Sequence, residues 1–99
     1  AVFATEHNMW IHFAVTLVAI VLGFVKQITA TEWLFLVLII ALVWMTELLN
    51  TAIEKAMDFI STETHPQIKL VKDIAAAAVL VTALAAVIIG GLIFIPKFL

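Results

Sequence analysis

The sequence alternates between long apolar runs and short polar stretches. Apolar side chains fill residues 13–25, 34–45 and 74–95 almost without interruption, and none of the three runs contains a charged residue. A helix needs about 20 mostly apolar residues to cross the roughly 30 Å hydrocarbon core of a bilayer. The pattern therefore predicts three membrane-spanning helices, at about residues 6–25, 33–60 and 73–95.

Cap and turn signals suggest where these helices begin and end. Thr5 is a candidate N-cap for the first helix, and the polar residues 26–32 predict a short turn before the second. Pro66 predicts a turn or a helix start, and Pro96 is expected to end the third helix. The whole chain reads as one domain.

The second helix is longer than a bilayer requires. No Gly or Pro interrupts residues 34–60, and at 1.5 Å per residue this segment would be about 40 Å long. On the same scale Glu47 lies about 20 Å along the segment, Glu54 about 30 Å, and Asp58 farther still. We therefore expect acidic side chains that pass from the lipid interior into water.

Four polar side chains share one stripe of this helix. Glu47, Asn50, Glu54 and Asp58 lie at offsets of three, seven and eleven residues. At about 100° per residue the carboxylates of Glu54 and Asp58 each fall within roughly 20° of that of Glu47. Carboxylates inside a membrane are costly, so this stripe is a candidate functional site.

Composition supports an all-α integral membrane protein. Of the 99 residues, 66% are hydrophobic and 12% are charged, against about 45–50% apolar and 25% charged in soluble domains. The net charge of −2 excludes the basic footprint of a nucleic-acid-binding protein. The chain has no cysteine, so any metal must bind oxygen or imidazole ligands.

Three spans place the N-terminus and loop 61–73 on one side of the membrane, with Lys26 and Lys97 on the other. Lys55, Lys69 and Lys72 lie on the side of the loop, and the positive-inside rule therefore favours a cytoplasmic loop. No cleavable signal pattern is present. Because the chain starts at Ala1 without a methionine, we expect that a leading segment is missing.

The polar positions have both chemical and structural interpretations. Glu6 can lie level with Glu54 and share Mg²⁺ with it, or it can simply stabilise a helix N-terminus. Burial of Glu47 would favour a general base, and a structural interhelical pair is the alternative. Asn50 either orients a reacting group or joins helices.

The positions near loop 61–73 are less specific on their own. Lys72, which precedes Asp73, could neutralise phosphate charge, although lysines at membrane boundaries often contact lipid headgroups. Glu63 and His65 could contact a nucleotide or could be solvated loop residues. His7 and His12 are equally ambiguous.

Residues 47–54, Glu-Leu-Leu-Asn-Thr-Ala-Ile-Glu, closely resemble the signature of the prokaryotic diacylglycerol kinase family, which includes undecaprenol kinases. The resemblance extends to Glu6-His7-Asn8, to Glu63-Thr64-His65-Pro66, and to Lys72-Asp73 before the Ala-rich third helix. It implies a homotrimer in the bacterial cytoplasmic (inner) membrane, with MgATP phosphorylating a lipid hydroxyl at the cytoplasmic face. The family's N-terminal amphipathic helix would precede Ala1.

The resemblance also implies roles for individual residues. Glu47 would accept the proton of the lipid hydroxyl, and Glu6 and Glu54 would bind Mg²⁺. The ATP-binding residues would be Glu6, Asn50, Glu54, Asp58, Glu63, Thr64, His65, Lys72 and Asp73. The lipid-substrate residues would be Glu47, Asn8, Met9, Trp10 and His12. Many family members have Arg, Tyr and Gly at or near the positions of Trp10, Thr64 and Ala75.

The sequence therefore predicts an ATP-dependent lipid kinase that converts diacylglycerol to phosphatidic acid. Undecaprenol is the alternative acceptor. An oligomeric transporter or proton-translocating subunit would also use an intramembrane carboxylate at Glu47. A structural membrane subunit is the third possibility. Dependence on MgATP distinguishes the kinase from the other two.

Overall fold

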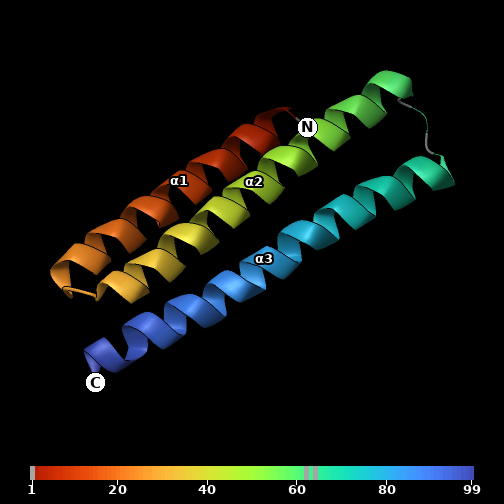
Figure 1. Ribbon diagram of the computed structural model, residues 1–99. Coiled ribbons are helices and arrows are strands. Elements are labelled where there is room, and N and C mark those ends of the chain that lie inside the picture. Colours follow the sequence, from red (N-terminus) through yellow and green to blue (C-terminus); the bar gives the residue numbers. More distant parts are fainter. Residues whose placement is uncertain (1, 62, 64) are drawn as a thin grey trace.

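The computed structural model contains three helices in an up-down-up arrangement (Figure 1): α1 (Val2–Val25), α2 (Ala30–Ile60) and α3 (Pro66–Phe98). It describes the backbone of residues 2–61, 63 and 65–99, and within that set the side chains from Met9 onward. The molecule is elongated, 51 × 21 × 20 Å, with α2 between α1 and α3. The prediction of an all-helical chain with three helices is confirmed.

A Schellman turn ends α1 and reverses the chain. The backbone N–H of Ile28 donates to the carbonyl of Gly23 at 3.1 Å, and that of Gln27 donates to the carbonyl of Phe24 at 3.3 Å. Gln27 takes the left-handed conformation this motif requires, with φ 51°. The energetic cost of this conformation is offset because the turn provides hydrogen-bond donors for carbonyls at the end of α1 that would otherwise lack partners.

A capping box starts α2. The side chain of Thr29 accepts a hydrogen bond from the backbone N–H of Glu32 at 3.2 Å, and the Glu32 carboxylate accepts one from the Thr29 backbone N–H at 2.9 Å. These reciprocal bonds satisfy two N–H groups at the helix start. The helix therefore begins at Ala30, three residues before the expected start at about residue 33, so residues 30–32 belong to the helix and not to the predicted turn, and it ends at Ile60.

Two expected helix ends are wrong. Thr5 lies inside α1, which begins at Val2, because no Gly or Pro before it interrupts helical backbone. Pro96 lies inside α3, which continues to Phe98. Pro96 removes one N–H donor from the last turn, and the two residues after it retain helical geometry. Pro66 occupies the first turn of α3, where its missing N–H costs no helical hydrogen bond.

The hydrophobic core gathers near the α1–α2 turn. Ile28, Leu36 and Ile93 are buried together, with partly buried neighbours from all three helices: Ala19, Trp33, Ile40, Ile89 and Phe94. Lys97 forms an ion pair with Glu32 at 3.1 Å, and Lys26 lies 4.1 Å above the Phe98 ring. These contacts confirm that Lys26 and Lys97 share one end of the molecule.

The outward-facing surfaces of the helices are apolar. Phe24, Val87 and Leu92 are 71%, 72% and 73% exposed. By length and composition, α2 and α3 are able to cross a membrane, and the described apolar part of α1, Met9–Val25, is shorter. Exposed apolar surface on this scale marks a membrane or protein contact.

Candidate functional site

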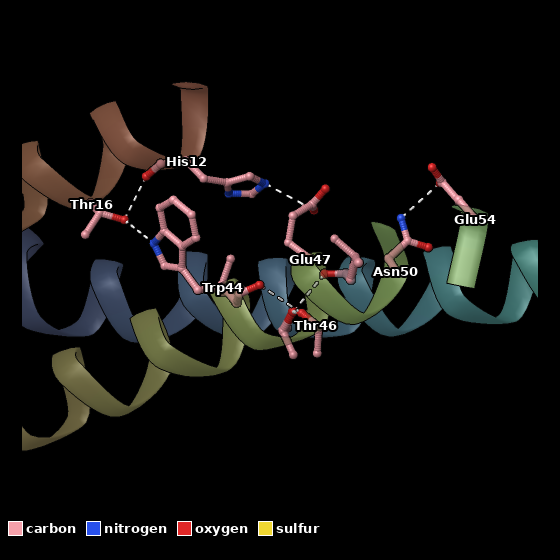
Figure 2. Close-up of polar contacts among 10 residues, drawn as sticks. His12, Thr16, Trp44, Thr46, Glu47, Asn50 and Glu54 are labelled. Atoms are coloured by element: carbon pink, nitrogen blue, oxygen red, sulfur yellow. Dashed lines mark hydrogen bonds and ion pairs between the residues drawn. The ribbon is translucent and has the colours of Figure 1, made fainter. Parts of the chain in front are cut away.

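Glu47 is the buried polar residue at the centre of the site. It lies in the middle of α2, is 6% exposed, and faces α1. Its Oε2 lies 3.2 Å from Nε2 of His12 (Figure 2). A buried carboxylate is costly unless it is hydrogen-bonded, and the imidazole supplies that partner.

A second set of contacts fixes His12 in place. The Thr16 hydroxyl donates to the His12 backbone carbonyl at 2.7 Å, and the indole N–H of Trp44 donates to the Thr16 oxygen at 2.8 Å. The His12 and Trp44 rings lie 6.1 Å apart at an angle of 56°. Trp44 therefore connects α2 to α1 beside the Glu47 contact (Figure 2).

The opposite side of α2 is joined to α3 by two hydroxyl groups. The Thr46 and Thr82 oxygens lie 2.9 Å apart. Each hydroxyl also bonds within its own helix, to the carbonyl of Val43 and of Val79 respectively, both at 3.0 Å. Such polar contacts hold apolar helices at a fixed rotation, and here they help to fix the direction in which Glu47 points.

Toward the end of α2 the acidic stripe becomes more exposed. Nδ2 of Asn50 donates to Oε1 of Glu54 at 3.1 Å. Glu47 is buried, Glu54 is partly buried, and the Asp58 side chain is 47% exposed. Among the side chains that the structure describes, the Asn50 Oδ1 is buried without a hydrogen-bond partner. The amide is thus fixed on one side and has an acceptor available on the other.

The water-exposed ends of α2 and α3 enclose a polar pocket of about 230 Å³. The Lys72 ammonium lies 2.6 Å from the Asp58 carboxylate, and the Lys69 ammonium lies 2.7 Å from Asp73. The hydrogen bond that the Lys69 ammonium donates to Asp73 raises the pKa of Lys69 above its ordinary value. The pocket is lined by Asp58, Ser61, Glu63, His65, Ile68, Lys69, Lys72 and Asp73.

A family model for prokaryotic diacylglycerol kinase matches residues 1–94. The chain belongs to the prokaryotic diacylglycerol kinase family. It is therefore a lipid kinase, a phosphotransferase, and the transport and structural alternatives are set aside. Together with the two long apolar helices, the family indicates a membrane protein.

The relatives carry two different substrate names. The chain is 43% identical to an undecaprenol kinase of Bacillus subtilis, over 94% of this chain and 76% of the relative. It is 39% identical to a diacylglycerol kinase of Synechocystis, over 98% of this chain and 56% of the relative. A diacylglycerol kinase of Helicobacter pylori is 41% identical over 69% of this chain and 53% of its own length.

Five of the kinase residues predicted from the sequence line the polar pocket together: Asp58, Glu63, His65, Lys72 and Asp73. Sequence reasoning missed Ser61 and Lys69 as part of it. A signal for Lys69 was available, because its spacing of four residues from Asp73 puts both on one helix face.

Other predicted residues are not brought to the site or lie outside the described part. Thr64 and the side chains of Glu6 and Asn8 are outside the described residues. Trp10 is 70% exposed and packs against Phe13, with ring centroids 6.3 Å apart. Met9 is partly buried. Within the described part of the chain, no three His, Asp or Glu residues gather as a metal site, and Glu6 is not included in that part.

An apolar groove of about 340 Å³ starts beside the His12–Glu47 contact. Residues of all three helices line it, and His12, Thr16 and Trp44 are the polar or partly polar ones near its Glu47 end. From there it follows α2 toward Leu36 and α3 toward Phe94. The groove provides a surface on which an apolar chain can lie with its polar end near Glu47.

Proposed function

We propose that this protein transfers the γ-phosphate of MgATP to the primary hydroxyl of a membrane lipid, with Glu47 as general base. The observation that carries the proposal is the graded burial of one helix stripe. A buried carboxylate, Glu47, lies on the same stripe as Asp58, which opens into an exposed polar pocket. This arrangement suits a reaction between a lipid and a water-soluble nucleotide.

In this proposal Glu47 receives the proton of the lipid hydroxyl. As the new oxygen–phosphorus bond forms and the bond to ADP breaks, the hydroxyl proton passes to the carboxylate. Phosphoryl transfer depends mainly on positioning and on neutralising phosphate charge. The Lys72 ammonium can supply that neutralisation by exchanging its Asp58 partner for a phosphate oxygen.

The nucleotide is proposed to occupy the polar pocket. Its residues include cations for the phosphates, Lys69 and Lys72, and loop side chains for the sugar or base, Glu63 and His65. Thr64 belongs to this proposal through the family resemblance. Along α2, Glu54 lies between the pocket and Glu47, about 10 Å from Glu47 on the helix axis. The γ-phosphate would therefore lie near Glu54 and Asn50.

Glu54 and Glu6 are the proposed ligands of Mg²⁺. Carboxylate oxygens suit this hard cation, and one oxygen of Glu54 is already oriented by Asn50. The contacts between α1 and α2 fit this pairing, because His12 of α1 lies opposite Glu47 of α2. The two helices run antiparallel. Glu6, six residues before His12, and Glu54, seven residues after Glu47, therefore have their backbones at about the same height along the helix axes. When bound, the ion would neutralise phosphate charge.

The acceptor is proposed to be diacylglycerol, as expected from the sequence, with undecaprenol as a second candidate. Both are apolar lipids with a primary hydroxyl, and the groove beside the His12–Glu47 contact offers an apolar surface to part of either chain. The undecaprenol kinase relative, which shares 43% identity with this chain, favours the second candidate. Asn8, Met9, Trp10 and His12 are the proposed lipid-contacting residues of α1.

We further propose a homotrimer in the bacterial cytoplasmic membrane, with three spans per chain and the active site at the cytoplasmic face. The exposed apolar faces of α2 and α3 would contact lipid and neighbouring subunits. Light scattering on purified protein would test the trimer. Accessibility of single cysteines placed in loop 61–65 to a membrane-impermeant thiol reagent would test the orientation.

The decisive experiment measures ADP release from MgATP by purified protein in lipid micelles, with diacylglycerol or undecaprenol. Glu47→Gln should retain the oligomeric state and lose at least about 100-fold in turnover, since a positioned base contributes 10²–10⁴-fold. Glu54→Ala should raise the Mg²⁺ concentration needed for half-maximal rate. Near-normal turnover of Glu47→Gln would exclude Glu47 as the base, and turnover with one lipid alone would name the acceptor.

A further inference from the structure

The His12–Glu47 contact involves only one of the two carboxylate oxygens of Glu47. One carboxylate oxygen, Oε2, is bonded to Nε2 of the imidazole at 3.2 Å. Among the described side chains, Glu47 Oε1 has no hydrogen bond (Figure 2). A general base is ionised before it acts and then only accepts hydrogen bonds, so in that state Nε2 carries the proton. The carboxylate is therefore held by one oxygen and free at the other.

The imidazole lies beside one aromatic ring, and that ring is itself hydrogen-bonded to α1. The Trp44 ring packs beside it, and the backbone carbonyl of His12 accepts the Thr16 hydroxyl, which in turn accepts the Trp44 indole N–H. The His12 side chain is 24% exposed and that of Glu47 is 8% exposed. The buried carboxylate therefore has the imidazole as its hydrogen-bond partner among the described side chains, and the position of the ring sets the position of Oε2.

We propose that His12 is a positioning residue for Glu47: its Nε2–H fixes Oε2 and thereby aims Oε1 at the hydroxyl of the lipid acceptor. This inference rests on the proposed function of Glu47 as general base. It gives His12 a role different from the lipid contact expected from the family resemblance. Misplacing a reacting group by about 1 Å can cost about 100-fold in rate, so the role is measurable.

Two substitutions separate the hydrogen bond from the rest of the side chain. His12→Gln keeps an N–H donor at the same number of bonds from Cα as Nε2. His12→Leu removes the donor and replaces the ring with an apolar side chain of similar bulk. We expect His12→Leu to lower kcat about 10- to 100-fold with the KM for ATP unchanged within about twofold. His12→Gln should retain at least about a third of kcat. The control is Leu17→Ala, an exposed position on the same helix, which should keep normal kcat.

A Glu47→Gln background tests whether His12 acts through Glu47. Adding His12→Leu there should lower the remaining rate by no more than about twofold, because the two groups act as one unit. A direct readout is the ¹⁵N spectrum of protein labelled at its histidines. The His12 signals, identified by their loss in His12→Gln, should report a protonated Nε2 and should move in Glu47→Gln.

The outcomes distinguish the two proposals. Normal turnover of Glu47→Gln would overturn the proposed base. Loss of activity in Glu47→Gln together with normal kcat in His12→Leu would overturn only the positioning role. That role would also be overturned if His12→Gln were as impaired as His12→Leu, if the two losses multiplied in the double variant, or if the His12 ¹⁵N signals were unchanged by Glu47→Gln.

Discussion

Each end of the α2–α3 pair carries one carboxylate–lysine ion pair, and the surroundings of the two ion pairs differ. At one end Glu32 of α2 meets Lys97 of α3 at 3.1 Å, and at the other Asp58 of α2 meets Lys72 of α3 at 2.6 Å. The first pair adjoins the hydrophobic core and its acid also caps a helix. The second lines a polar pocket. A carboxylate of α2 is thus paired with a lysine of α3 both at the packed end, near the core, and at the open end, beside the pocket.

The comparison separates structural charge from charge available to a ligand. Exposed ion pairs contribute about 0–1 kcal/mol to stability, so the Asp58–Lys72 pair does little to hold the helices together. For the same reason, replacing Asp58 by a phosphate oxygen as the partner of Lys72 costs little. A weak ion pair at the open end suits the proposed nucleotide site, because a ligand can replace one partner easily. The packed end instead holds the buried hydrophobic cluster of the fold.

The largest expected difference between the ends is in activity. Lys72→Met should lower turnover about 100-fold, equivalent to about 2.7 kcal/mol, because it removes the cation that we propose neutralises phosphate charge. The matched variant Lys97→Met, which loses the same charge at the packed end, should remain within about twofold of normal. ADP release under saturating lipid measures both. Equal losses in the two variants would contradict the assignment of the phosphate site to the open end.

The next largest effect tests how tightly the packed end is built. A Cβ added at Gly23 would lie 2.6 Å from the Trp33 ring and 3.2 Å from Ile28, and Trp33 is itself packed 4.9 Å from the Phe24 ring. Gly23→Ala should therefore destabilise the protein by about 1–3 kcal/mol. Thermal unfolding in detergent would detect this as a lower midpoint.

Gly90→Ala provides the matched control, because a Cβ at Gly90 meets no atom within 4 Å. In a helix interior this change should raise stability by about 0.5–1 kcal/mol. If both glycine variants lowered the midpoint equally, the close packing of Trp33 on Gly23 would not be what limits stability at this end.

The helices of both ends could be predicted from the sequence, because their signals are local. Long apolar runs and the absence of Gly or Pro within residues 34–60 predict α2 to its last residue. Helix ends were less predictable. Thr5 has the chemistry of a cap but lies within a helix, and Pro96 breaks one hydrogen bond so near the end of α3 that the helix continues past it.

The pairings within the site were less predictable than the residues. The spacing of Glu47, Asn50, Glu54 and Asp58 on one stripe follows from helix periodicity alone. By contrast, the choice of His12 as partner depends on how α1 is rotated against α2, and helices that are apolar on nearly every face carry no pattern that fixes this rotation. The Trp44–Thr16 bond between α2 and α1 fixes this rotation.

A smaller effect concerns the strength of the packed-end ion pair itself. Lys97→Met should lower the thermal midpoint in detergent by no more than about 4 °C, because the Lys97 side chain is 29% exposed and the capping box of Glu32 persists without it. Lys72→Met should shift the midpoint by a similar amount. A much larger shift in either variant would mean that its ion pair holds the helices together.

The smallest expected effect is the pH dependence of the packed end. The Thr29 backbone N–H, followed by the Lys97 ammonium, holds the pKa of Glu32 below its ordinary value. A depressed carboxyl pKa contributes stability that is complete above the unfolded-state value of about 4.3, and this stability is lost as the pH falls through the lower folded-state value.

Glu32→Gln, which keeps an acceptor but no charge, should therefore unfold at a lower midpoint than the parent at pH 7. At pH 3 the two midpoints should lie closer together, since the carboxyl of the unfolded parent is then largely protonated and the stability from the lowered pKa is reduced. A midpoint difference that is the same at both pH values would show that the charge of Glu32 contributes nothing and that its hydrogen bond alone starts α2.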